Sequence, residues 1–282
     1  YPLLARSIAS HEDEYRRWAS NTAVFLPNGR VPLAGEKFVQ ADLARTIQFM
    51  ADQDRAAGAD REAGLKAAHD AFYRGDIAHE IVKFQQQEGG YLSMQDLAEY
   101  RSAIEPVVRR RWRGHELITC GAWCQGPALQ QALALVEQVG IDGLAHNSAD
   151  YLHRIVACLN LALADREHYF GDPRFVDVPI DWLLDPATIA RRATAVQDDR
   201  AFDQMPAPLD RRGEAFAATD AALPKVEADT SYCCVVDRWG NAFSATPSDG
   251  SGNVPVVPGL GITPSGRGSQ SRPDPRHPAG VA

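Results

Sequence analysis

Apolar residues recur at helical spacing along the first third of the chain. The spacing predicts three helices, over residues 41–51, 62–73 and 76–87. The apolar stripe of the first helix consists of Leu43, Ile47 and Met50. Gly89 and Gly90 end the third helix. Ser93 then stands three residues before Asp96, a capping box that predicts a short helix ending near Tyr100.

The middle of the chain predicts one strand and two long helices. Residues 116–119 are typical of a strand, and Gly126-Pro127 begins a helix that ends at Gly140. That helix places Leu129, Leu133 and Val136 on one face. The longest predicted helix runs from about Ala149 to Phe170, before Gly171 and Pro173. Its apolar positions repeat at spacings of three and four: Leu152, Ile155, Val156, Leu159 and Leu163.

A change of pattern follows, from helix to connector to strand. Residues 198–229 lose periodicity and carry prolines among charges, which predicts an exposed connector and a boundary. Two β-rich runs, 231–237 and 242–246, flank Gly240-Asn241 and predict an antiparallel hairpin. The proline- and glycine-rich stretch 246–282 is predicted to be loop.

Composition narrows the classes of function. The chain has 282 residues, 45% of them hydrophobic, and a formal net charge of −8. An acidic chain without a basic block offers nothing to a phosphate backbone, so we expect no nucleic-acid partner. No apolar run approaches the roughly 18 residues of a membrane span. Because the sequence starts at Tyr1 without Met and stops at Ala282 within a Pro/Gly stretch, we expect a piece of a longer protein, whose compartment the sequence leaves unknown.

Three groups of residues that could suggest other functions are better explained as structural. Cys120 and Cys124 lack Cys-x-x-Cys spacing and a second ligand pair, so buried thiols are favoured over zinc. The basic run 109–113 precedes the predicted strand, which favours a surface edge over a nucleic-acid site. The wide spacing of the histidines near the longest helix argues against a metal site: His146, His153 and His168. We expect no metal site at these cysteines or histidines.

One position joins the connector to the hairpin in a way that could carry chemistry. If the bond between Asp229 and Thr230 were cut, Thr230 would own both a hydroxyl and a free α-amino group, whose pKa of roughly 8 suits a general base. Nucleophile and base would then be one residue. From the residues alone, a β-forming threonine at a strand start explains Thr230 as well.

The run DTSYCCVVDRWGNAFS from Asp229 resembles the start of the small subunit in the γ-glutamyltranspeptidase family of N-terminal nucleophile hydrolases. Four upstream motifs resemble its large subunit, in the same order: AFYRGDIA from Ala71, GGYLSMQDLAEY from Gly89, WCQGPALQ from Trp123 and ADREHYFGDP from Ala164. The resemblance spans about Gly35 to His277. It implies an α+β fold, an αββα sandwich incomplete in this chain. Residues 1–229 would be the C-terminal part of the large subunit, and 230–282 the start of the small subunit.

The resemblance also implies an activity. Thr230 would cleave the chain after Asp229, then attack the γ-glutamyl amide of a substrate such as glutathione and pass the acyl group to water or an amino acid. Ser248 occupies the position of a family hydroxyl that hydrogen-bonds the nucleophile, although a turn serine is the alternative. No cofactor is implied, and the partners would be the substrate, the acceptor and the remainder of the two subunits.

Two departures from the family leave the substrate open. The family usually has Asn where this chain has Gly250, and the later segment that binds the substrate amino group has no clear counterpart after Gly261. Asp249 could pair with a substrate ammonium and Arg267 with a carboxylate, or both could be solvated loop residues. The resemblance places the carboxylate-binding Arg and the oxyanion hole outside this chain. A cephalosporin-type amide acylase and an uncleaved, non-catalytic family member therefore remain as alternatives.

Overall fold

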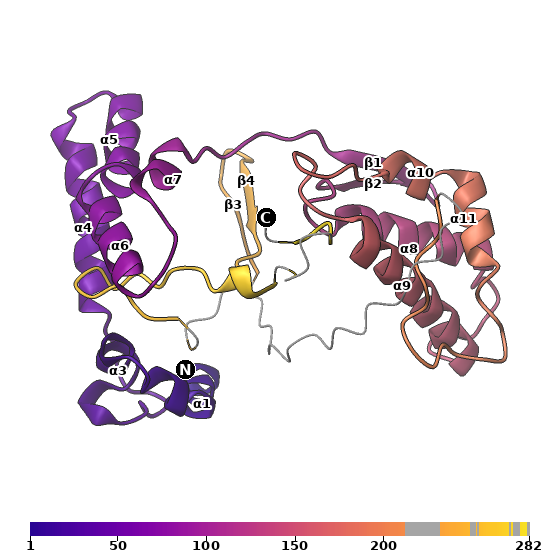
Figure 1. The fold of residues 1–282 in the computed structure, drawn as a ribbon, viewed down its shortest axis with the longest axis horizontal. Helices are drawn as coiled ribbons and strands as arrows, with labels where there is room; N and C mark the ends of the chain where they lie inside the picture. Colours follow the sequence, from indigo (N-terminus) through magenta and orange to yellow (C-terminus); the bar gives the residue numbers. More distant parts are fainter. Residues whose placement is uncertain (212–231, 249–251, 253, 271, 273–276, 281–282) are drawn as a thin grey trace. The chain divides into compact units, whose positions relative to one another are not determined.

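The computed structural model describes residues 1–211, 232–248, 252, 254–270, 272 and 277–280. The chain divides into two compact units, each built from two stretches of sequence. The first unit consists of Tyr1–Ser102 with Lys225–Ser269, and the second of Ala103–Pro224 with Gln270–Ala282. Helices dominate both units, and each of the two described sheets has two strands (Figure 1). These units are compact bodies rather than cleavage products, so the division into subunits at Asp229–Thr230 stays a prediction.

The first unit begins with three short helices that the apolar spacing did not predict. They are α1 (Pro2–Ser10), α2 (Glu12–Tyr15) and α3 (Ala19–Phe25), followed by a 3-10 turn, η1 (Pro27–Gly29). None of the three has an N-cap side-chain hydrogen bond, so that start signal is missing. Their core stacks Tyr15 on Phe25, with ring centroids 4.3 Å apart, and includes Val256 from late in the chain.

The next four helices confirm the predictions for residues 41–100. They are α4 (Ala41–Ala56), α5 (Arg61–Tyr73), α6 (Asp76–Gln87) and α7 (Met94–Glu99). The capping box between Ser93 and Asp96 is present in both directions. The predicted stripe of α4 is only partly right, because Ile47 is 59% exposed while the neighbouring Thr46 is buried.

The described residues of the second unit form a β-hairpin and four helices. Strands β1 (Val108–Trp112) and β2 (His115–Thr119) pair antiparallel, with Arg110 opposite Leu117. The basic run 109–113 is thus mainly a strand itself, rather than the edge before one. The prediction missed β1 because Arg110 takes an inward position, where its guanidinium donates to the carbonyl oxygen of Leu184 at 2.9 Å. The helices are α8 (Gly126–Val139), α9 (Ala149–Tyr169), α10 (Ile180–Leu183) and α11 (Pro186–Ala193).

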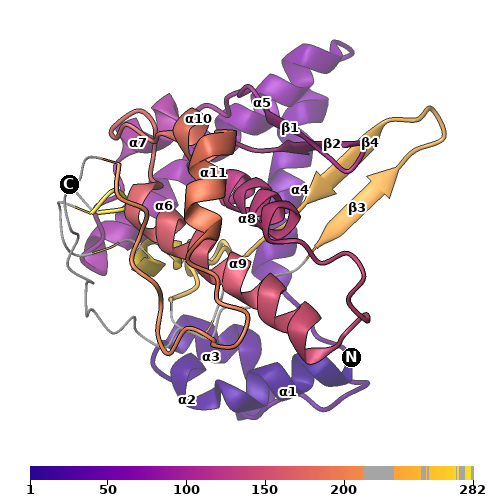
Figure 2. The ribbon, with the colours of Figure 1, turned by 90° about the vertical axis from the view of Figure 1, so that its right-hand side faces the viewer.

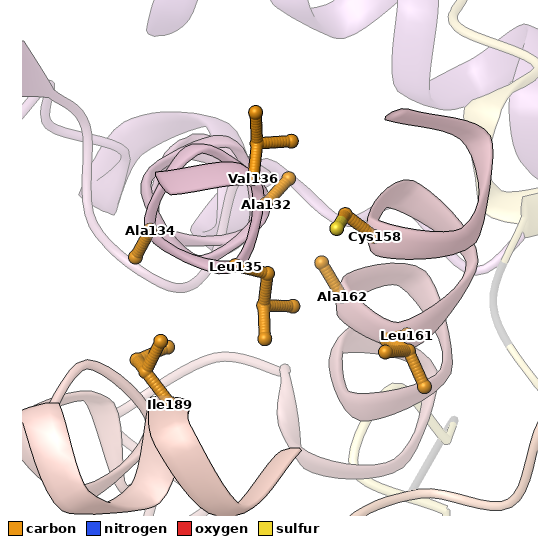
Figure 3. Close-up of a cluster of buried hydrophobic side chains, with 8 residues drawn as sticks. All are labelled: Ala132, Ala134, Leu135, Val136, Cys158, Leu161, Ala162 and Ile189. Carbon is orange, nitrogen blue, oxygen red and sulfur yellow. The ribbon is translucent and has the colours of Figure 1, made fainter. Parts of the chain in front are cut away.

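Helices α8, α9 and α11 surround the core of the second unit (Figure 2). Leu135, Leu161 and Ile189 meet at its centre, and small side chains fill the remaining space (Figure 3). The small residues are Ala132, Ala134, Cys158 and Ala162. Helices α8 and α9 lie where predicted, whereas α10 and α11 were not predicted. The predicted faces of α8 and α9 are partly wrong: Leu129 is 51% exposed and Val156 is 52% exposed. Alanines let the helices approach closely, so the buried faces include small residues as well as large ones.

The late part of the chain confirms the predicted hairpin. Strands β3 (Cys233–Val236) and β4 (Ala242–Ala245) pair antiparallel around Gly240-Asn241. The described residues after 245 are irregular, apart from the 3-10 helix η2 (Arg267–Gln270) and isolated bridges such as Val257↔Ile262. Among the described helices, none combines the length and apolar character needed to cross a bilayer.

Candidate functional site

The turn of the β3–β4 hairpin is fixed by the side chain of Asp237. Its Oδ1 accepts the backbone N–H groups of Trp239 and Asn241, each at 2.9 Å, and its Oδ2 accepts from Asn241 Nδ2 at 2.8 Å. These hydrogen bonds, first among them that from the Asn241 side chain, hold the pKa of the Asp237 carboxyl below its ordinary value. Gly240 supplies the left-handed residue of the turn with φ of 85°. These contacts fix the turn and so set the register in which β3, the strand that follows the predicted nucleophile, pairs with β4.

Two of the predicted site residues lie in contact. The guanidinium of Arg267 donates from Nε to the carbonyl oxygen of Ser248 and from Nη2 to its hydroxyl Oγ. Both residues are partly buried. Ser248 follows the last residue of β4 by three positions, so the contact joins the end of the hairpin to the first residue of η2.

The segment between these two residues is anchored to the helices of the first unit. Asn21 on α3 is fully buried, and its Nδ2 donates to the carbonyl oxygen of Val254 at 2.9 Å while its Oδ1 accepts the N–H of Val256 at 2.6 Å. On α4, Thr46 Oγ1 donates to the carbonyl oxygen of Leu260 at 2.8 Å. The backbone that precedes Arg267 is therefore held at two points.

The other predicted site residues lie outside the described part of the structure. These are the nucleophile candidate Thr230, the preceding Asp229, and the substrate-binding candidates Asp249 and Gly250. Of the predicted residues, the structure thus brings together Ser248 and Arg267. Among the described residues, no three His, Cys, Asp or Glu side chains gather in a way that could hold a metal ion.

Sequence reasoning missed a buried polar cluster that holds the described end of the connector. Asp165 on α9 pairs with Arg192 on α11, and it also accepts from Gln131 Nε2 at 2.7 Å. The backbone N–H of Leu209 donates to Asp165 Oδ1 at 2.6 Å, and Arg192 donates to the carbonyl oxygen of Ala207 at 2.9 Å. Burial raises the pKa of the Asp165 carboxyl, while the charge of Arg192 opposes that rise. The sequence offered one signal of this cluster, the acidic residue Asp165 beside the apolar positions of the longest predicted helix.

The cluster binds the predicted connector directly, because Ala207 and Leu209 are connector residues. Tyr169 adds a third contact, from its hydroxyl to the carbonyl oxygen of Leu209 at 2.6 Å. The described part of the predicted connector is thus irregular, as expected, but residues 207–209 are docked on α9 and α11 rather than free in solvent.

Comparison with known proteins gives a consistent result. The family model described as Gamma-glutamyltranspeptidase matches residues 1–276. A glutathione hydrolase proenzyme of Pseudomonas aeruginosa is 32% identical over 251 residues, which are 85% of this chain and 39% of the relative. The chain therefore spans about two fifths of the length of that relative.

Solved structures of similar fold agree. The structure of LmbA2991HD superimposes with a TM-score of 0.86 and 31% identity, over 99% of this chain and 50% of that chain. The cephalosporin acylase from Bacillus halodurans gives a TM-score of 0.72 and 25% identity, over 97% of this chain and 46% of that chain. Both matches extend over nearly all of the present sequence.

Proposed function

Because this chain belongs to the gamma-glutamyltranspeptidase family and has its N-terminal nucleophile hydrolase fold, we propose that it forms part of an amide hydrolase or acyltransferase whose nucleophile is Thr230. The observation that carries the proposal is the extent of the family match, which covers residues 1–276 and so includes Asp229 and Thr230. The activity is thus proposed for the protein that contains both sides of that bond.

The proposed maturation step uses the hydroxyl of Thr230. Its oxygen attacks the carbonyl carbon of Asp229, the C–N bond between the two residues breaks, and the acyl group moves to the hydroxyl oxygen as an ester. Water then hydrolyses the ester, which leaves a carboxylate on Asp229 and a free α-amino group on Thr230. That amine, with a pKa of roughly 8, is suited to act as a general base near neutral pH.

Turnover repeats the same attack on a substrate. The amine of Thr230 takes the hydroxyl proton while the oxygen attacks the amide carbonyl, and the leaving amine departs with a proton. The resulting acyl-enzyme ester is resolved by water or by the amine of an acceptor, which regenerates the hydroxyl. Ser248 is proposed to hydrogen-bond the nucleophile, and its position three residues after β4, which pairs with β3, suits a group that must be fixed relative to β3.

For the substrate we propose a γ-glutamyl amide such as glutathione, with an amide acylase activity as the second candidate. The second candidate is favoured by a specific feature, since Gly250 stands where the family resemblance leads us to expect an asparagine for the glutamyl end. Asp249 and Arg267 stay candidates for binding a substrate ammonium and carboxylate.

The proposal is tested with the encoded protein, including any residues that flank this sequence. Intact mass and N-terminal sequencing should find a chain that begins at Thr230, and Thr230→Ala should abolish both cleavage and turnover. Rates on γ-glutamyl anilides against glutaryl and adipyl anilides divide the two substrate classes. A wild-type chain that stays uncut and turns over none of these amides would favour a non-catalytic family member.

A further inference from the structure

We propose that Arg267 is a positioning residue that orients the hydroxyl of Ser248. The inference rests on the proposed function, in which Ser248 assists Thr230, and adds to it a residue that acts through Ser248. Its basis is the pair of hydrogen bonds from one guanidinium to the carbonyl oxygen and the Oγ of Ser248.

The chemistry of the two groups decides which way the serine proton points. Arginine carries only donors, whereas a hydroxyl has one donor and two acceptor lone pairs. When the Nη2–H of Arg267 occupies a lone pair of Ser248 Oγ, the hydroxyl proton must point elsewhere. The contact therefore leaves the hydroxyl proton of Ser248 for donation to a further group, and the hydroxyl of the proposed nucleophile would be such a group.

Serine also needs this restraint more than threonine does. A β-branched residue is stiff at its first side-chain torsion, whereas serine lacks the second heavy atom on Cβ and is freer to rotate. The Nε of Arg267 binds the carbonyl oxygen of the same residue whose Oγ it holds through Nη2, so backbone and side chain of Ser248 are fixed together. Two contacts from one rigid, planar group restrain both the position and the torsion.

Arg267 can act in this way because hydrogen bonds hold the backbone segment that precedes it. Asn21 and Thr46 fasten the preceding segment to α3 and α4, and the Val257↔Ile262 bridge closes it on itself. The N–H of Arg267 donates to Ser265 Oγ at 3.2 Å at the start of η2. The guanidinium thus reaches Ser248 from a fixed base.

A positioning role differs measurably from the substrate-carboxylate role considered for the same side chain. If Arg267 binds substrate, its replacement should raise KM, and it should do so whether or not residue 248 has a hydroxyl. An arginine that acts through Ser248 acts on kcat, and its loss has no further effect once the hydroxyl is gone.

The test is a double-mutant cycle in the cleaved, full-length protein with Arg267→Met, Ser248→Ala and both changes together. Arg267→Met should lower kcat by about 10-fold or more, because acid–base groups contribute roughly 10²-fold or more when well placed. The double variant should match Ser248→Ala alone, and Arg267→Lys should recover only part of kcat because it cannot make both contacts. Arg238→Met is the control, since that exposed side chain lies over Trp239 in the hairpin turn and its effect should be the same in both backgrounds.

A second measurement, of melting temperatures, detects the contact between Arg267 and Ser248 without relying on turnover. The Tm losses of the two single variants should exceed, when summed, the loss of the double variant. Equal kcat losses from Arg267→Met in both backgrounds, a change in KM alone, or additive Tm losses would each overturn the proposal. A wild-type protein with no amide turnover would instead remove the proposed function and the role of Arg267 with it, while the Tm cycle still decides whether the contact exists.

Discussion

Arg192 and Asp165 form an ion pair of 2.9 Å inside the second unit, with Asp165 fully buried and the side chain of Arg192 7% exposed. The pair ties α11 to α9, and through Leu209 and Ala207 it also holds the described end of the connector. Two charges removed from water are tolerated there because each is satisfied by several hydrogen bonds.

Removal of one partner should therefore be costly. Arg192→Met leaves the Asp165 carboxylate buried without its cation and should lower the free energy of unfolding by about 3–5 kcal/mol. Urea denaturation measures this loss. The control is Arg200→Met, which breaks an exposed pair with Asp203 and should cost no more than about 1 kcal/mol. Similar losses from both variants would contradict the buried network.

Replacing both partners by apolar residues should be milder than the sum of the single changes. Asp165→Leu with Arg192→Met removes both charges, so neither remains unpaired in the core. The same urea curves should show a loss for the double variant clearly below the two single losses combined. An additive result would mean that the two side chains do not depend on each other.

Asn21 should be a stability determinant although it is a polar residue of a short helix. Asn21→Ala leaves the N–H of Val256 and the carbonyl oxygen of Val254 without their side-chain partner, which should cost about 2 kcal/mol in unfolding free energy. Gln95→Ala on the exposed face of α7 is the control and should be nearly neutral. An Asn21 variant as stable as this control would refute the anchoring of residues 254–256.

Cys158 should resist alkylation in the folded protein. Burial raises the pKa of its thiol to about 11, so at pH 8 its thiolate fraction is roughly 100-fold below that of an ordinary cysteine. Mass-spectrometric mapping of iodoacetamide labelling should find Cys120, Cys233 and Cys234, which are exposed, modified first. Comparable rates for Cys158 and Cys233 would contradict the packing of α8 against α9.

The same thiol predicts a pH dependence of stability. The pKa of the Cys158 thiol is higher in the folded state than its ordinary value of about 9. The contribution of this thiol to the free energy of unfolding is therefore complete below about pH 9 and is lost as the pH rises toward about 11. Unfolding free energies measured between pH 8 and 11 should fall less steeply in Cys158→Ala than in the wild type. Parallel pH curves for the two proteins would contradict this assignment.

Much of the fold could be predicted from sequence because the long helices carry strong local signals. The capping box at Ser93 and the glycine after α8 mark helix ends that depend on few other residues. The buried faces were harder to predict, because which side of a helix is covered depends on distant segments: Thr46 is buried partly by the backbone of Leu260. Strand β1 was missed because an inward arginine broke its alternation.

The candidate site was predictable only in part for the same reason. Ser248 and Arg267 could be named individually from the family resemblance and from charge, but their contact spans a loop without periodicity. The hydrogen bonds of the cluster around Asp165 join pairs of residues up to 44 positions apart, so no local pattern reveals it. Tertiary hydrogen bonds between irregular segments are the part of the structure that the sequence pattern leaves open.

The most direct test of self-cleavage before Thr230 is N-terminal sequencing with intact mass of the purified, full-length protein, wild type beside Thr230→Ala and Thr230→Ser. We predict a new chain beginning Thr-Ser-Tyr-Cys in the wild type, slower release of that chain in Thr230→Ser, and a single uncut chain in Thr230→Ala. Cleavage before residue 230 in Thr230→Ala, or a wild type that turns over amide substrates while remaining uncut, would contradict it.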